Sequence, residues 1–98
     1  MAERHIHLHP LAADEAEAAR VWYAERNPRA AEMFLDELDF AIARVAENPQ
    51  RWPQLRGRFR RYIFPKFPFS LVYRFTPTSI EVVAVAHHRR KPAYWKLR

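Results

Sequence analysis

Apolar side chains recur with a helical period between residues 28 and 47, and this feature limits the fold most. Charged side chains fall mostly on the opposite side, so the segment is amphipathic and must bury one face against another layer. Asn27-Pro28 supplies an N-cap oxygen and a first helical residue, and Asn48-Pro49 ends the helix. The predicted core face consists of Ala31, Phe34, Leu35, Leu38, Ala41, Ile42 and Val45.

A second helix is predicted just before it, from Leu11 to about Arg26, where the sequence is rich in Ala and Glu. Pro10 precedes it and fits the first turn of a helix. Trp22 and Tyr23 are expected to pack at the interface between the two helices. Ala12, Ala16, Ala19 and Tyr23 recur at helical spacing and form a narrow stripe suited to close packing.

Strand patterns occur at the start of the chain and throughout its second half. The alternation over 5–9 predicts a short strand with Ile6 and Leu8 facing inward. Later strands are predicted over 58–64, 69–75 and 80–86. The last is apolar apart from Glu81, which indicates a central strand covered on both faces. Residues 51–57 show no periodicity and are predicted to form a loop. The face-sharing residues of the 69–75 strand are Phe69, Leu71, Tyr73 and Phe75.

The order β-α-α-β-β-β predicts an α+β fold, an antiparallel sheet with a two-helix layer on one face. The first strand is expected to pair against the later meander, and 87–98 is expected to be a basic tail. The 98 residues suit one domain, 1–98. There is no cysteine, no apolar run of membrane-spanning length and no leader pattern at the start, so we expect a cytoplasmic protein without membrane contact.

Charge is divided unevenly between the halves of the chain. Residues 1–48 contain five Lys/Arg and ten Asp/Glu, a net of −5, whereas 49–98 contain twelve Lys/Arg and Glu81, a net of +11. Side chains that only keep a surface soluble usually mix both signs. The asymmetry therefore predicts a basic face that meets a polyanion or an acidic partner.

No metal or cofactor is predicted. His5, His7 and His9 share one strand face, but residues two apart on a strand are about 6.6 Å apart and these lack acidic or cysteine neighbours. A solvated strand face explains them better than a metal site. Gly57 is the sole glycine, so a phosphate-binding glycine loop is excluded.

Several motifs stand in a particular order. Phe69-Ser70-Leu71-Val72-Tyr73-Arg74 precedes Ile80-Glu81-Val82-Val83-Ala84-Val85-Ala86-His87-His88-Arg89-Arg90. Upstream lie the helix joint at 22–31, Asn48-Pro49, Trp52-Pro53 and the segment 55–61. Together these segments resemble the toxins of the RelE/ParE superfamily of type II toxin–antitoxin systems, over essentially the whole chain. The resemblance implies a toxin neutralised by a cognate antitoxin with an acidic C-terminal segment.

Two branches of that superfamily share the fold and differ in chemistry. RelE-like members are ribosome-dependent mRNA endonucleases, whereas ParE-like members inhibit DNA gyrase and are not known as nucleases. RNA cleavage needs a base, cationic donors for the phosphate and an acid. In this chain Ile63, Ser70 and His88 stand where the resemblance leads us to expect basic residues. If the chain is RelE-like, the catalytic residues would be Arg61, His88, Arg90 and Tyr94.

These departures favour a ParE-like toxin that binds gyrase, with an mRNA endonuclease of rearranged site as the alternative. A non-toxic, basic nucleic-acid-binding module is a third hypothesis. In the toxin hypotheses, a basic sheet surface invites the acidic antitoxin segment. The candidate contacts to antitoxin or target are Arg58, Arg60, Arg61, Arg74, Arg89 and Arg90.

Overall fold

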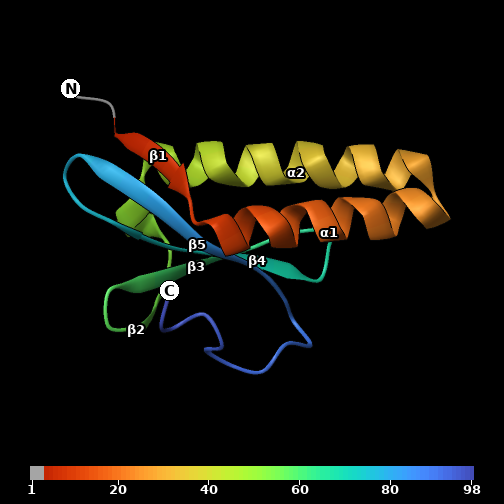
Figure 1. Ribbon diagram of the computed structural model, residues 1–98. Coiled ribbons are helices and arrows are strands. Elements are labelled where there is room, and N and C mark those ends of the chain that lie inside the picture. The colour runs from red at the N-terminus through yellow and green to blue at the C-terminus, as the bar shows by residue number, and fades with distance from the viewer. Residues whose placement is uncertain (1–3) are drawn as a thin grey trace.

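A computed structural model describes residues 4–98 and shows two antiparallel helices packed on one face of a five-stranded sheet (Figure 1). The predicted α+β class, with its helix layer on one face, is confirmed. Along the chain the elements are β1 (His5–Leu8), α1 (Pro10–Arg26), α2 (Pro28–Glu47), the 3-10 turn η1 (Pro49–Arg51), β2 (Gln54–Arg56), β3 (Phe59–Ile63), β4 (Phe69–Phe75) and β5 (Ser79–His87).

Both helices begin at capped prolines, within one residue of the predicted bounds. The Asn27 side chain accepts a hydrogen bond from Arg29 N at 3.0 Å, and His9 Nδ1 accepts one from Leu11 N at 3.1 Å. Within residues 4–98, neither helix is long and apolar enough to cross a bilayer. The side chains buried between the helices and the sheet include Ala12, Ala16, Ala19, Phe34, Leu38, Ala41 and Val45.

Two expected packing residues lie outside this layer. Leu35 is 37% exposed, and Trp22 is 50% exposed instead of packing between the helices. The cause is geometric, because only a narrow stripe of each helix faces the sheet and these two side chains lie at its margin. Tyr23, next to Trp22, does pack against the core as predicted.

The strand order is β1-β5-β4-β3-β2, and every neighbouring pair is antiparallel except β1 and β5. The predicted antiparallel sheet therefore has one parallel pair at its edge, and the first strand pairs with a strand of the later meander as expected. No tight turn sets the relative direction of β1 and β5, because both helices and the meander lie between them in the chain. The inward placement predicted for Ile6 and Leu8 is wrong. They are 42% and 38% exposed because β1 is an edge strand that the helices leave partly uncovered.

The predicted loop over 51–57 is replaced by the end of η1 and the short strand β2. β2 pairs with β3 across a turn in which Gly57 has φ 55°, a conformation that glycine adopts without strain. All three residues of β2 are exposed, so no alternation of polar and apolar side chains marks it in the sequence.

Both faces of the sheet carry a core. The larger core lies against the helices, and the smaller one lies on the opposite face around Val72, Val83 and Trp95. β5 contributes to both cores, as its apolar sequence predicts. The C-terminal segment 88–98 is not a free tail, because it runs back across this second face (Figure 1) and buries Trp95 to 5% exposure.

Candidate functional site

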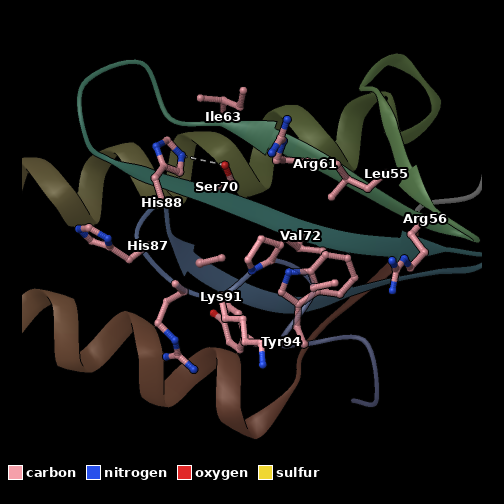
Figure 2. Close-up of a pocket in the computed structure, with 15 residues that line it drawn as sticks. Leu55, Arg56, Arg61, Ile63, Ser70, Val72, His87, His88, Lys91 and Tyr94 are labelled. Atoms are coloured by element: carbon pink, nitrogen blue, oxygen red, sulfur yellow. Dashed lines mark hydrogen bonds between the residues drawn. The ribbon is translucent and has the colours of Figure 1, made fainter.

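The sheet face opposite the helices holds a cavity of about 470 Å³, here called the outer groove (Figure 2). Arg61 and Ile63 of β3 and Ser70 and Val72 of β4 form its floor. These residues share a face because side chains alternate along a strand. The C-terminal segment forms the opposite wall, which includes Tyr94.

His88 is fixed at one end of the outer groove. Its Nε2 lies 3.0 Å from the hydroxyl oxygen of Ser70, which is 3% exposed, and its backbone N donates to Pro68 O at 2.9 Å. Figure 2 shows this pair beside Ile63, whose apolar side chain is 55% exposed. A titratable imidazole and an apolar side chain therefore meet at this end of the groove.

Glu15 of α1 organises the other wall. Its carboxylate accepts a 2.6 Å hydrogen bond from the Tyr94 hydroxyl and a 3.1 Å bond from Val85 N of β5. Arg98 forms two further bonds to the same carboxylate, at 2.9 and 3.0 Å. The Glu15 side chain is only 14% exposed. One partly buried carboxylate thus ties the C-terminal segment to both α1 and β5.

Burial, together with the hydrogen bond to Glu15 and its negative charge, raises the pKa of the Tyr94 phenol far above its usual value. The guanidinium of Arg90 lies over the Tyr94 ring at 3.9 Å from its centroid. The phenol is therefore neutral and already engaged as a donor, and Arg90 covers one of its faces.

A second cavity, of about 670 Å³, lies between α1 and the start of the C-terminal segment; it is called the flank groove here. It shares with the outer groove a wall made of His87, His88, Arg90 and Tyr94. Burial lowers the pKa of His87, and the nearby charges of Arg89 and His88 lower it further. The two grooves thus lie on either side of one basic wall.

The description "ParE toxin of type II toxin-antitoxin system, parDE" belongs to a family model that matches residues 6–92. The chain belongs to this ParE toxin family. Among solved structures it is similar to "Chromosomal ParDE TA system from P. aeruginosa", with TM-score 0.76 and 15% identity, covering 87% of this chain and 96% of that one. That likeness shows the shared fold. No curated protein sequence matches the chain.

As a ParE-family toxin of a parDE pair, the chain has a cognate ParD antitoxin as its partner. The superfamily resemblance seen in the sequence is therefore confirmed. In this ParE fold the four residues considered for RelE-like catalysis all line the outer groove: Arg61, His88, Arg90 and Tyr94.

The six arginines considered for partner contacts are not gathered in one place. Arg60 turns inward and donates to the carbonyl oxygen of Trp52 at 2.7 Å. Arg74 bonds Glu81 at 2.7 Å and the carbonyl oxygen of Arg98 at 3.0 Å. These two support the fold around η1 and the C-terminus. Of the other four, Arg58 lies at the β2–β3 turn and Arg61 in the outer groove, while Arg89 and Arg90 line the flank groove.

Sequence reasoning missed Glu15 and Arg98. A signal for Glu15 was present, because it is a charged residue placed between Ala12, Ala16 and Ala19 on the buried stripe of α1. No comparable signal marks Arg98, whose partners lie far away in the chain. Across residues 4–98, no group of three His, Asp or Glu side chains could hold a metal ion.

Proposed function

We propose that this ParE toxin arrests growth by binding a protein target, DNA gyrase, through the outer groove, without cleaving RNA. The observation that carries the proposal is the engagement of the Tyr94 hydroxyl with Glu15 at 2.6 Å. A phenol that donates to a partly buried carboxylate and carries a strongly raised pKa is poorly placed to serve as a general acid or base at neutral pH.

The floor of the outer groove supports the same proposal. Cleavage of a phosphodiester needs several cations around the phosphate. Here the floor between Arg61 and His88 consists of Ile63 and the buried Ser70. An exposed apolar side chain flanked by arginine is typical of the centre of a protein–protein interface. The floor of the groove therefore suits a protein surface, while Arg56, Arg90 and Lys91 line its other sides.

Neutralisation by the antitoxin follows from the charge of the same region. We infer that the acidic C-terminal segment of the cognate ParD antitoxin contacts Arg58, Arg61, Arg89 and Arg90. Arg90 is included because its side chain is 53% exposed, although it also lies 3.9 Å from Glu15 and over the Tyr94 ring. Arg60 and Arg74 are left out because their guanidinium groups already have internal partners.

A second candidate, ribosome-dependent mRNA cleavage, is supported by one observation. Arg61, His88 and Arg90 line a single groove, and the imidazole of His88 is oriented by Ser70 at 3.0 Å. Such a set could supply cations and an acid–base group without Tyr94. This set is incomplete for a RelE-like nuclease, because Ile63 and Ser70 stand where the resemblance leads us to expect basic residues.

Induced expression in a bacterial host distinguishes these functions. Growth, transcript ends and a DNA-damage reporter are scored together, with and without the antitoxin. We expect arrest with an induced damage response, intact transcripts and rescue by the antitoxin. Arrest with new transcript ends inside codons would establish the nuclease, and absence of arrest would leave a binding module.

A further inference from the structure

The outward side of α2 carries exposed apolar side chains, and the cavity there shares no lining residue with either groove. Met33 is 40% exposed, and Phe40, about two turns later, is 54% exposed. Both line this cavity of about 420 Å³, whose lining residues are here called the helix patch. The helix patch consists of Met33, Asp36, Glu37, Phe40, Pro65 and Lys66.

The helix patch lies on an acidic part of the surface. Asp36 is exposed within it, and Glu32 and Asp39 are exposed on the same helix. Glu37 accepts a 2.8 Å hydrogen bond from the backbone N of Lys66, which holds the β3–β4 loop against α2. The patch thus combines large apolar side chains with exposed carboxylates. This combination fits a cationic occupant that also offers an apolar floor.

The outer groove has the opposite charge and an apolar floor of this kind. Of the described residues that line it, four are permanently cationic and none is acidic. The four are Arg56, Arg61, Arg90 and Lys91. The exposed side chains of Leu55 and Ile63 lie beside Arg61 (Figure 2). A carboxylate and an aromatic side chain of the helix patch would each meet a complementary group there.

Two copies of the chain are better matched through these different surfaces than through the same one. A two-fold pairing of helix patches would bring Asp36 of each copy against the acidic helix of the other, and like charges repel. Pairing the helix patch with the outer groove joins opposite charges. The division of charge along the chain, −5 over 1–48 and +11 over 49–98, favours the same arrangement. At physiological ionic strength, screening over about 8 Å weakens the long-range repulsion between two chains of net charge +6 and leaves close contacts effective.

We propose that a second copy of this chain docks its helix patch in the outer groove, with Phe40 over Ile63 and Asp36 beside Arg61. The helices and the outer groove lie on opposite faces of the sheet (Figure 1), so one copy can use both surfaces at once. The contact is heterologous, and association therefore continues into longer chains or closes into a ring. A groove filled in this way is closed to other proteins. That last consequence, a self-masked toxin at high concentration, rests on the proposed binding of the target through the outer groove.

Sedimentation velocity of the full chain measures the contact over a concentration series. Phe40→Lys removes the apolar anchor and places a cation against the cationic groove, and Ile63→Asn replaces the apolar floor with an amide. The matched controls are Val21→Lys on α1 and Ile6→Asn on β1. They change exposed apolar residues that lie outside the helix patch and both grooves. Circular dichroism verifies each fold first.

We expect the average mass of the wild-type chain to rise over a series that reaches roughly 1 mM. Phe40→Lys and Ile63→Asn should each raise the dissociation constant of self-association about ten-fold or more, as loss of a central contact does. The two controls should stay within about two-fold of the wild-type chain. A wild-type chain that stays monomeric throughout the series would overturn the proposal, and so would equal losses in the controls.

A mixture of the two defective variants distinguishes this contact from a two-fold one. The Ile63→Asn chain keeps its helix patch, and the Phe40→Lys chain keeps its outer groove. An equimolar mixture should therefore form one-to-one dimers with the wild-type affinity and nothing longer, although each variant alone stays monomeric. A mixture that stays as monomeric as its components would contradict a heterologous contact.

A gyrase supercoiling assay separates self-association from the proposed target. Phe40 lies outside the outer groove, so Phe40→Lys should inhibit gyrase more strongly per mole than the wild-type chain at concentrations where the wild-type chain self-associates. Equal inhibition per mole at those concentrations would show that the contact leaves the groove open, against the proposal. If neither chain inhibits gyrase, the target proposal fails, and sedimentation still decides whether the helix patch binds the outer groove.

Discussion

The hydroxyl of Tyr94 donates a 2.6 Å hydrogen bond to the carboxylate of Glu15, 79 residues earlier in the chain. Arg98 and Val85 N bind the same carboxylate. Three segments remote in sequence are thereby joined: α1, β5 and the C-terminus. The side chain that a nuclease of this superfamily would be expected to use in catalysis is thus part of the framework that holds the groove's wall.

Replacement of Glu15 by alanine should weaken this framework. Arg98, whose side chain is 12% exposed, would lose its counter-charge, and Tyr94 and Val85 N would lose their acceptor. We expect the free energy of unfolding to fall by about 3 kcal/mol in urea denaturation. Glu17→Ala is the matched control, because Glu17 is an exposed residue of the same helix that pairs only with Arg20. Equal midpoints for the two variants would show that Glu15 does not anchor the C-terminus.

Tyr94→Phe keeps the aromatic ring and removes only the hydroxyl. Because one donor to Glu15 is lost, the free energy of unfolding should fall by about 1 kcal/mol. Growth arrest should be unchanged, since the proposed mode of action uses no phenolic proton. A variant that folds and no longer arrests growth would instead favour the RelE-like mechanism.

Tyr73→Phe tests the junction between the sheet and η1. Tyr73 is 0% exposed, and its hydroxyl donates to the carbonyl oxygen of Pro49 at 2.5 Å. Removing the hydroxyl leaves that carbonyl without its donor, so thermal or urea unfolding should show a loss of about 1–2 kcal/mol. Burial raises the pKa of Tyr73 to about 12. The loss should therefore be fully present below pH ~10, where the unfolded tyrosine is also protonated, and should diminish above it.

His87 should titrate below its ordinary pKa of 6.5, because burial and the charges of Arg89 and His88 disfavour its protonated form. The unfolded chain then binds the proton more strongly, so this residue contributes stability above pH ~6.5 that declines as the pH falls through that value. NMR titration of the imidazole signals measures the shift. Arg89→Gln should raise the pKa of His87, and an unchanged titration curve would show that Arg89 has no part in it.

The sequence predicted those elements whose side chains alternate or repeat against a core. The stripe of α2 and the apolar run of β5 both mark burial directly, and the motif order located the family. β2 was not predicted, because an exposed edge strand of three residues has no alternation of polar and apolar side chains. The parallel pairing of β1 with β5 was not predicted either, because it depends on tertiary packing. The four residues considered for catalysis all line the outer groove, and their roles stay a prediction. The internal partners of Arg60, Arg74 and Tyr94 depend on how the strands and the C-terminal segment pack, which local sequence patterns do not show.

The most direct test of a gyrase-binding, non-nucleolytic toxin is a supercoiling assay with purified gyrase and the purified chain, run beside a translating-ribosome assay that maps mRNA ends. We expect the chain to inhibit supercoiling, Tyr94→Phe to inhibit it equally, and the antitoxin to relieve the inhibition, while the mRNA stays intact. Cleaved mRNA on the ribosome, with gyrase unaffected and cleavage abolished in Tyr94→Phe, would contradict the account.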